Sequence, residues 1–202
     1  MAKVAIVYHS GYGHTEVLAQ KAAQGVRDAG GEASLVRIQG AGDDFGPALD
    51  ALADADAILF GSPTYMGDVS AAFKAFAEAS SKVLATGAWK DKLAGGFTVS
   101  HSFAGDKGHT IDTLSTLAAQ HSMVWVSLGV PPPSVPAAER GPDTLNRVAG
   151  FAGLLAQADN ASSEITPPEG DRETARLFGE RIAKAAIRWV RGAAESPISL
   201  AA

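Results

Sequence analysis

The 202-residue sequence contains no cysteine, and this absence removes two kinds of chemistry. No disulfide bond can stabilise the chain, and no thiolate can act as a nucleophile. A phosphatase that uses a cysteine nucleophile on a phosphate-binding loop is therefore excluded. The lack of cysteine also agrees with a cytoplasmic location, where disulfides are rare.

Long hydrophobic runs and a strong net charge are absent as well. No apolar stretch approaches the roughly 20 residues that a membrane-spanning helix needs. The N-terminal residues show no basic and apolar regions of a secretion signal, so we expect no leader. The 17 basic and 22 acidic residues give a formal net charge of −5, which argues against a nucleic-acid or anionic-membrane partner. His9, His101 and His109 have no partner at metal-ligand spacing, so no metal site is predicted. We expect a cytoplasmic protein with no membrane span and no nucleic-acid partner.

Short apolar runs alternate with helical patterns along the chain, which is typical of an α/β protein. Four of the five runs are apolar almost throughout, as expected for parallel strands covered on both faces, and the mixed second run indicates an edge. We predict one domain over residues 1–192 with a doubly wound, five-stranded parallel sheet of order 2-1-3-4-5 and helices on both faces. Such a sheet binds its ligand beyond the carboxyl ends of strands one and three. The strands are expected at 3–8, 33–38, 57–61, 93–100 and 123–128, and the helices near 14–29, 47–54, 70–85, 110–121 and 172–191.

A long proline-rich segment, 129–169, separates the last strand from the last helix. A segment of this length without clear periodicity indicates a lid, a binding loop or an assembly surface. Within it, residues 148–156 either form a short helix or pack against the parent domain. We expect residues 193–202 to be a mobile tail.

The most informative part of the sequence is the loop at residues 9–15, which follows the first strand directly and opens a helix. The first turn of a helix has free N–H groups and a partial positive charge, so it attracts phosphate. Gly11 and Gly13 let the backbone come close, and the hydroxyls of Ser10 and Thr15 add donors. Because the loop lacks lysine and arginine, it suits one enclosed phosphate monoester better than a nucleoside triphosphate. A small-residue turn that binds nothing remains the alternative for this loop alone.

Other phosphate-binding motifs are excluded by residue type. The Walker A tripeptide Gly-Lys-Ser/Thr does not occur. The dinucleotide fingerprint needs a glycine where this chain has Glu16, and Ile38-Gln39 replaces the acidic residue expected after the second strand. A receiver domain would carry acidic residues at the ends of its first and third strands. This chain has Tyr8-His9 and Gly61-Ser62 at those positions, so a receiver domain is excluded.

Two further polar loops follow the third and fourth strands, at 61–68 and 100–108. In the predicted sheet the carboxyl ends of these strands meet the first loop at one edge. Ser70 is placed as the N-cap of the helix after the second loop, and Asp68 is expected to face solvent or cap that helix. Three glycine-containing loops therefore converge on one crevice.

With these loops the chain resembles the flavodoxin-like superfamily, and more closely the WrbA-type NAD(P)H:quinone oxidoreductases. The resemblance covers residues 3–191 and rests on Ser-Gly-Tyr-Gly-His-Thr at 10–15, Gly-Ser-Pro-Thr-Tyr-Met-Gly at 61–67, His-Ser-Met at 121–123 and the proline-rich segment. It implies that the first loop holds the phosphate of FMN, the second lies along the flavin ring and the third completes the flavin edge. The cofactor-binding residues that it implies are Ser10, Tyr12, Gly13, His14, Thr15, Pro63, Thr64, Tyr65, Met66, Gly67, Ser100, Ser102, Phe103, Ala104, Gly105 and Asp106.

The resemblance also implies that His121 lines the pocket for nicotinamide and quinone. A histidine at the C-terminal end of a helix can equally be a surface residue stabilised by the helix dipole. Tyr12 and Tyr65 either contact the flavin or fill the crevice. For the histidine both interpretations stay open at this point, and for the tyrosines the loop context favours ligand contact.

The sequence therefore predicts an FMN enzyme that takes a hydride from NADH or NADPH and passes two electrons to a quinone-like acceptor, with the flavin carrying the chemistry. One alternative is a flavodoxin-type electron carrier, although the balanced charge does not favour the single-signed docking face that a carrier needs. The other is an FMN-binding regulatory or assembly module without turnover. The resemblance further implies a homo-oligomer, a dimer or more often a tetramer, that segment 129–169 helps to build.

Overall fold

The computed structural model describes residues 1–195, and its elements follow the predicted alternation of strands and helices. The strands are β1 (Lys3–His9), β2 (Glu32–Ile38), β3 (Ala57–Tyr65), β4 (Asp68–Val69), β5 (Leu93–Ser100), β6 (Val124–Trp125) and β7 (Leu154–Gln157). The helices are α1 (His14–Asp28), α2 (Gly46–Ala51), α3 (Ala71–Ala79), α4 (Ser81–Thr86), α5 (Lys107–Gln120), the 3-10 helix η1 (Ala137–Glu139) and α6 (Glu169–Glu195).

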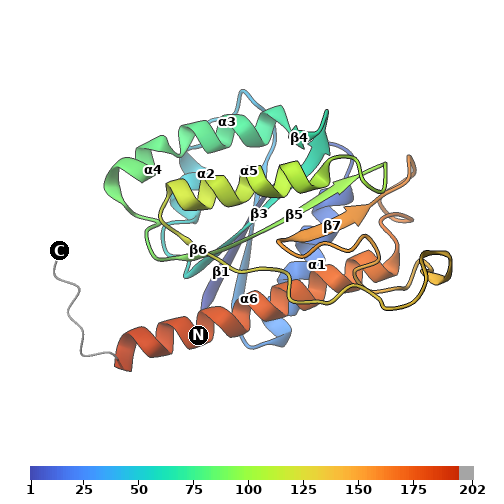
Figure 1. Ribbon diagram of the computed structural model, residues 1–202. Coiled ribbons are helices and arrows are strands. Elements are labelled where there is room, and N and C mark those ends of the chain that lie inside the picture. Colours follow the sequence, from blue (N-terminus) through green and yellow to red (C-terminus); the bar gives the residue numbers. More distant parts are fainter. Residues whose placement is uncertain (196–202) are drawn as a thin grey trace.

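The strands form one sheet of order β2-β1-β3-β5-β6, in which β4 pairs with β3 and β7 pairs with β5. Helices α1 and α6 cover one face of the sheet, and α2 to α5 cover the other (Figure 1). The predicted parallel order and the helices on both faces are confirmed. The prediction of five parallel strands is wrong, because the described residues form seven strands and the short β4 runs antiparallel to β3.

The outer edge of the sheet is built from two separate pieces of chain. β6 pairs with the start of β5, and β7 pairs with its end. Residues 126–153, which we call the insertion loop, leave the sheet between these two pieces and return to it. The predicted segment 129–169 is therefore not one loop, since β7 divides it into the insertion loop and a second loop at 158–168.

One prediction for this edge is wrong, and one open alternative is decided. The predicted strand at 123–128 stops at Trp125, because the chain turns away after Val126 and β7 takes the place beside the second half of β5. Residues 148–156 form no helix. Their last residues enter β7 and pack against the parent sheet, which agrees with the other interpretation of that segment.

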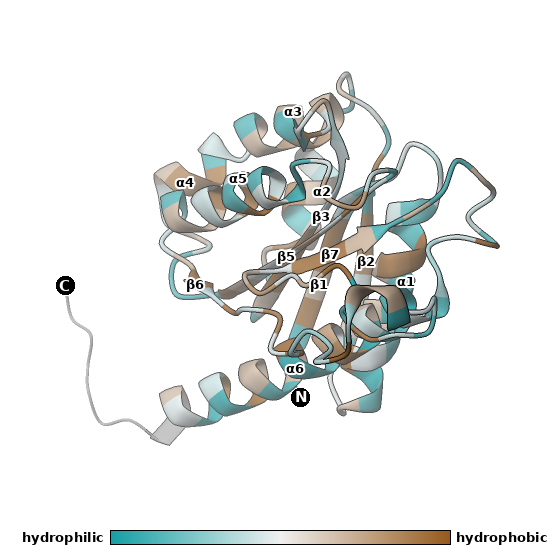
Figure 2. Ribbon diagram, turned by 45° about the vertical axis from the view of Figure 1, so that its right-hand side comes forward, coloured by the Kyte–Doolittle hydropathy of each residue, from teal (hydrophilic) through white to brown (hydrophobic). Residues whose placement is uncertain are grey.

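Two hydrophobic cores fill the spaces on the two faces of the sheet. Successive side chains of one strand enter different cores, so that Ile6 packs toward α1 and α6 while Val7 packs toward α3. Figure 2 shows hydrophobic residues along the central strands and a mixture of hydrophobic and hydrophilic residues along the helices. Burial on both faces explains why the central strands are apolar almost throughout.

Helices α1 and α6 touch at two glycines. A Cβ on Gly25 would lie 1.8 Å from the carbonyl oxygen of Arg176, and one on Gly179 would lie 1.9 Å from that of Ala22. The atoms in the way belong to the backbone and cannot rotate aside, so no side chain fits at either position. This close contact fixes α1, and with it the helix N-terminus that faces the predicted crevice.

The C-terminal helix is longer than the sequence predicts. The pattern indicates a helix over 172–191, whereas α6 extends from Glu169 to Glu195. The predicted mobile tail, 193–202, thus begins inside the helix, and residues 196–202 lie outside the described part of the chain. None of the helices within residues 1–195 combines the length and the apolar character needed to cross a bilayer.

Candidate functional site

A cavity of about 440 Å³ opens at the carboxyl ends of the central strands, where the topology predicts a crevice. Its volume lies in the range of small-molecule sites. Three of the four segments that line it are the predicted loops, and the fourth follows β7. The lining residues are Gly11, Tyr12, His14, Thr15, Pro63, Thr64, Tyr65, Val99, Ser100, His101, Ala158, Asp159, Asn160 and Ala161.

The first loop turns directly into α1. Gly13 is the N-cap residue and has a φ of 86°, a left-handed conformation that favours glycine. The hydroxyl of Ser10 accepts the N–H of Glu16 at 3.1 Å. The backbone N–H groups of His14 and Thr15, in the first turn, have no hydrogen-bond acceptor within residues 1–195, both residues line the cavity, and Thr15 is buried. This geometry suits an anion held by neutral donors.

A cation stands behind this loop, although the loop sequence contains none. Arg37, near the end of β2, donates to the Glu16 carboxylate at 2.8 Å and to the Ser10 carbonyl at 3.2 Å. The Tyr8 hydroxyl donates to the same carboxylate at 3.4 Å. Glu16 neutralises Arg37, and neither side chain lines the cavity. The first loop therefore offers the cavity only uncharged donors, the backbone N–H groups and the Thr15 hydroxyl, as the sequence predicts.

The second loop is held by a chain of buried hydroxyl groups. The Thr64 Oγ1 lies 2.7 Å from that of Thr98 and 2.8 Å from that of Thr110, which links β3, β5 and α5. The next side chain, Tyr65, lies against the first loop, where a Cβ on Gly11 would come within 2.5 Å of its hydroxyl. Burial raises the pKa of Tyr65, so the phenol stays neutral. The first and second loops therefore come this close because residue 11 is glycine, and a side chain there would displace the Tyr65 ring.

Sequence reasoning missed the fourth wall of the cavity, the segment 158–161 after β7. The Ala161 carbonyl lies 2.8 Å from Nε2 of His14 and so joins this segment to the first loop. A short apolar run at 153–156, followed two residues later by Asp159-Asn160, is a weak strand-and-turn signal that would have indicated it. The signal is weak because four apolar residues show no reliable period.

Seven of the sixteen predicted cofactor-binding residues line the cavity. Ser10 and Gly13 shape the first loop, Met66 and Gly67 form the turn between β3 and β4, and residues 102–106 form the outer part of the third loop. The role of these nine residues stays a prediction. The seven that line the cavity are Tyr12, His14, Thr15, Pro63, Thr64, Tyr65 and Ser100.

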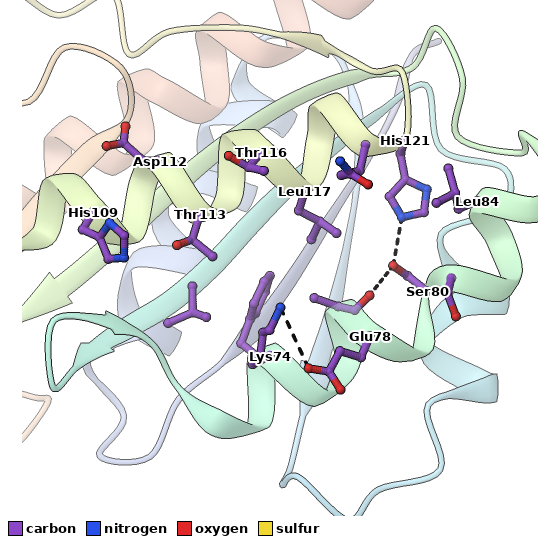
Figure 3. Close-up of a pocket in the computed structure, with 15 residues that line it drawn as sticks. Lys74, Glu78, Ser80, Leu84, His109, Asp112, Thr113, Thr116, Leu117 and His121 are labelled. Carbon is purple, nitrogen blue, oxygen red and sulfur yellow. Dashed lines mark hydrogen bonds and ion pairs between the residues drawn. The ribbon is translucent and has the colours of Figure 1, made fainter.

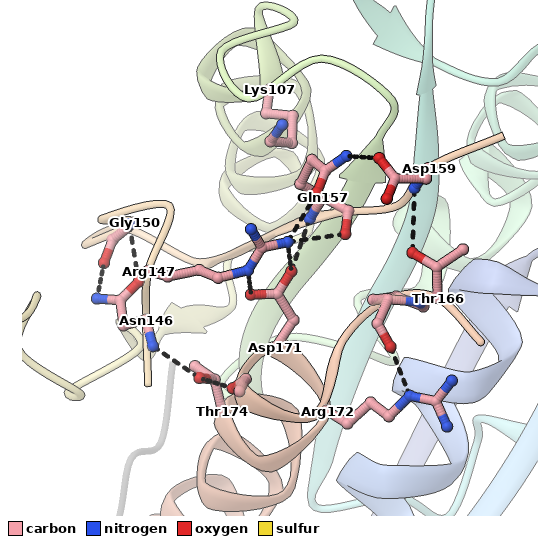
Figure 4. A network of polar contacts seen from close by, with 12 residues as sticks. Lys107, Asn146, Arg147, Gly150, Gln157, Asp159, Thr166, Asp171, Arg172 and Thr174 are labelled. Carbon is pink, nitrogen blue, oxygen red and sulfur yellow. Dashed lines mark hydrogen bonds and ion pairs between the residues drawn. The ribbon is translucent and has the colours of Figure 1, made fainter. Parts of the chain in front are cut away.

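A buried polar network lies behind the third loop and the fourth wall (Figure 4). Arg147, from the insertion loop, donates to both carboxylate oxygens of Asp171 at 3.0 and 3.1 Å. It also donates to the side-chain oxygen of Gln157 at 2.8 Å, and the Gln157 amide donates to the His101 carbonyl and the Asp159 carboxylate, both at 2.9 Å. The network thus connects the insertion loop to two residues that line the cavity.

Lys107, the first residue of α5, is completely buried. Its Nζ donates to the Ser100 hydroxyl at 2.8 Å and to the Ser102 carbonyl at 2.6 Å. Burial lowers the pKa of Lys107 to about 8, against the opposing effect of the Asp171 carboxylate. Because Ser100 lines the cavity, Lys107 holds the third loop from behind.

We expect the stability of the FMN-free protein to depend on Lys107 above pH 8. The ammonium group titrates near 10.5 in an unfolded chain and at about 8 in the folded protein, so between these values only the unfolded chain keeps the proton. The free energy of unfolding then rises with pH across this window, by about 1–3 kcal/mol. Urea unfolding at several pH values, compared with the Lys107→Met variant, measures the rise. Parallel profiles for the two proteins would contradict it.

His121 lies in a separate groove and not in the crevice. The groove, of about 580 Å³, runs between α3, α4 and α5, with His109 at one end and His121 at the other (Figure 3). At 1.5 Å per residue, α5 carries His121 about 20 Å from the crevice. Its Nε2 lies 2.9 Å from the Ser80 hydroxyl, and its ring packs on Trp89. Burial lowers the pKa of His121, and within one chain its side chain does not reach the crevice.

The groups around the crevice fit FMN. A single phosphate matches the free N–H groups and the hydroxyl of Thr15, and Gly11 keeps the cradle open where a Cβ would meet Tyr65. The rest of the cavity is lined by residues 63–65, 99–101 and 158–161, mostly with small or flat surfaces suited to a ring. Within this set the first loop has the donors that a phosphate would need, and the other three segments border the space that a flavin ring would fill.

Residues 3–131 match the family described as NADPH-dependent FMN reductase. Flavodoxin FldP of Pseudomonas aeruginosa is 42% identical over 184 residues, which are 91% of this chain and 96% of that protein. A NAD(P)H dehydrogenase (quinone) of Caulobacter vibrioides is 31% identical over 206 residues, covering 93% of this chain and 98% of that one. The crystal structure of a WrbA-like flavodoxin from Agrobacterium tumefaciens is 40% identical, with a TM-score of 0.73 over 93% of this chain and 99% of the other.

Proposed function

We propose that this chain, which belongs to the NADPH-dependent FMN reductase family, is an enzyme. It passes two electrons from NADH or NADPH through FMN to a quinone-like acceptor. The predicted resemblance to the flavodoxin-like superfamily and its WrbA-type members is confirmed, and FMN is the cofactor, with a reduced nicotinamide as the donor. The name of the Caulobacter relative supports a quinone as the acceptor. The cysteine-free composition supports a cytoplasmic location.

The observation that carries this proposal is the phosphate cradle at the start of α1, which opens into the crevice. Free N–H groups and the Thr15 hydroxyl bind and orient one end of the cofactor, while Tyr65 and the 158–161 segment enclose it. The sixteen residues named from the sequence are our proposed set of cofactor contacts, to which we add His101 and residues 158–161.

Bound FMN supplies the hydride acceptor and the two-electron donor. In the overall reaction, NAD(P)H gives one hydride and solvent gives one proton, and the quinone becomes a hydroquinone with two added electrons and two added protons. The side chains of the crevice bind and orient, and none has to act as an obligatory acid or base. Donor and acceptor use the same open side of the site in turn, so we expect ping-pong kinetics.

Steady-state oxidation of NADH and NADPH with a benzoquinone, measured on FMN-loaded protein, tests the proposal. We expect turnover and parallel lines in double-reciprocal plots when the acceptor concentration is varied. FMN-loaded protein that binds the cofactor but does not oxidise either nicotinamide would contradict it.

A second candidate function is that of an electron carrier, which the name of the Pseudomonas relative favours. A carrier would accept electrons from a reductase and would not oxidise NAD(P)H by itself. The same assay therefore separates the two functions, since a carrier turns over only when a flavodoxin reductase is added. FMN binding without activity in either assay would leave a regulatory or assembly module.

We propose that the protein forms a homo-oligomer, a dimer or a tetramer, in which the insertion loop helps to build the assembly. The loop exposes Val135, Leu145 and Phe151, and a neighbouring subunit is a natural way to bury them. Light scattering at micromolar concentration should give a multiple of the 20.7 kDa chain mass. A monomeric mass with full quinone turnover would contradict both the assembly and its connection to activity.

His121 can meet a substrate only if another subunit brings its crevice to the groove, because its own crevice is too far along α5. We expect His121→Ala to lower kcat/KM for the quinone or the nicotinamide about three- to tenfold, the worth of one hydrogen bond, and to leave FMN bound. Ser80→Ala, which removes the hydroxyl partner of Nε2, is the matched variant and should have a smaller effect in the same direction. Unchanged kinetics for His121→Ala at full FMN occupancy would assign this histidine a purely structural role.

A further inference from the structure

An ammonium group is buried behind the third loop without a charged partner. Lys107 is completely buried, and both acceptors of its Nζ, the Ser100 hydroxyl and the Ser102 carbonyl, are uncharged. Removing a charge from water without a counter-ion is costly. The sequence indicates no role for this lysine, and its contacts with Ser100 and Ser102 show only that it holds the third loop in place.

The nearest buried carboxylate does not neutralise Lys107. Asp171 accepts two hydrogen bonds from Arg147 and a third from the backbone N–H of Gln157, at 2.8 Å. Lys107 forms no ion pair with any carboxylate of residues 1–195. Two buried cations and one buried carboxylate leave an excess of one positive charge.

The excess charge lies on the side of the crevice. Ser100 lines the cavity, and Lys107 holds it and Ser102 from the first turn of α5. The N-terminus of α5 adds its partial positive charge at the same place. The carboxylates of Asp106 and Asp159 are exposed, where solvent and salt screen them more strongly than a buried group. An anion that forms in the crevice would therefore meet a net positive field from this side.

We propose that Lys107 is a positioning residue that holds the third loop and, by its charge, favours the reduced, negatively charged form of bound FMN over the oxidised form. The inference rests on the proposed function, because it needs the flavin ring beside the third loop. The ring is uncharged when oxidised, so a nearby positive charge stabilises mainly the reduced form. A purely mechanical effect on the loop would weaken the binding of both forms alike.

The test compares Lys107→Met, Lys107→Gln and wild type, with Lys90→Met as a matched control at an exposed position before the start of β5, at the end of that strand opposite the third loop. The dissociation constant of oxidised FMN is measured by fluorescence titration, and the midpoint potential of bound FMN by anaerobic redox titration. In both Lys107 variants we expect the affinity for reduced FMN, relative to oxidised FMN, to fall about tenfold. For a two-electron couple this lowers the midpoint potential by about 30 mV. Lys90→Met should keep the wild-type potential.

Weaker binding of oxidised FMN with an unchanged midpoint potential would overturn the proposal, since Lys107 would then only hold the loop. If Lys107→Met fails to fold, Lys107→Gln decides, because its amide can still donate to the Ser102 carbonyl while the charge is gone. Wild-type protein that does not bind FMN at all would refute the proposed function, and that failure is seen before any variant is compared.

Discussion

The Thr15→Glu variant is expected to lose FMN binding completely. Thr15 is 1% exposed, lies in the first turn of α1 and lines the cavity. A glutamate there places an anion where the phosphate dianion must bind, and it removes the hydroxyl donor as well. Two like charges a few ångströms apart at a buried position repel each other by several kcal/mol. We expect fluorescence titration to detect no binding under conditions that saturate the wild-type protein.

Two matched variants separate charge from shape in this experiment. Thr15→Ala removes one charge-assisted hydrogen bond and should weaken FMN binding by only about 1–3 kcal/mol. Gln24→Glu adds the same charge to an exposed position of the same helix and should leave the affinity unchanged. Equal affinities for wild type and Thr15→Glu would show that the phosphate binds elsewhere.

The first loop and the order of the sheet were predictable because their signals are local. A strand that leads through Gly11 and Gly13 into an amphipathic helix determines the phosphate cradle within a few residues. The alternation of apolar runs and helices then leaves few parallel arrangements, since crossovers are right-handed. The N-cap at Ser70 is equally local, and its hydroxyl accepts the N–H of Phe73 at 3.2 Å.

The supports behind the loops were not predictable, because each one joins residues far apart in the sequence. Arg37 reaches Ser10 from the next strand, and Arg147 reaches Asp171 from the insertion loop. Nothing in the sequence near Lys107 indicates that its side chain turns inward, because a lysine at a helix start is usually solvated. Charged residues in irregular segments have no period, so only the packed structure shows which of them are buried.

The edge of the sheet shows a different limit. The run at 123–128 is apolar enough to be a strand, yet Val126 and Leu128 fill core space from an irregular segment while β7 occupies the ladder. Hydrophobicity indicates that a residue is buried and leaves open which backbone pairs with the neighbouring strand. The segment 158–161 reaches the cavity because β7, which precedes it, pairs with β5. Since the sequence did not reveal β7, it did not reveal this fourth wall either.

Breaking the buried ion pair at Arg147 is expected to destabilise the whole protein. The Arg147 and Asp171 side chains are 7% and 1% exposed, so Arg147→Met would leave a buried carboxylate with only the Gln157 N–H as a partner. Removing one member of such a pair costs about 3–5 kcal/mol. Urea unfolding followed by circular dichroism measures the loss. Arg176→Met is the matched control, because the carboxylates that Arg176 contacts are partly exposed, and it should cost no more than about 1 kcal/mol.

The double variant Arg147→Met/Asp171→Asn tests the physical reason for that loss. Without the carboxylate no buried charge is left unpaired at this position, and the asparagine oxygen can still accept the Gln157 N–H. The double variant should therefore be more stable than Arg147→Met alone, a non-additivity expected for residues in direct contact. Both variants lose the hydrogen bond from Arg147 to Gln157, and the Gln157 amide holds His101 and Asp159 at the crevice. The FMN affinity of both variants should therefore fall by a similar amount, even though their stabilities differ. If instead Arg147→Met unfolds no more easily than Arg176→Met and binds FMN as tightly as wild type, the network neither stabilises the fold nor positions the site.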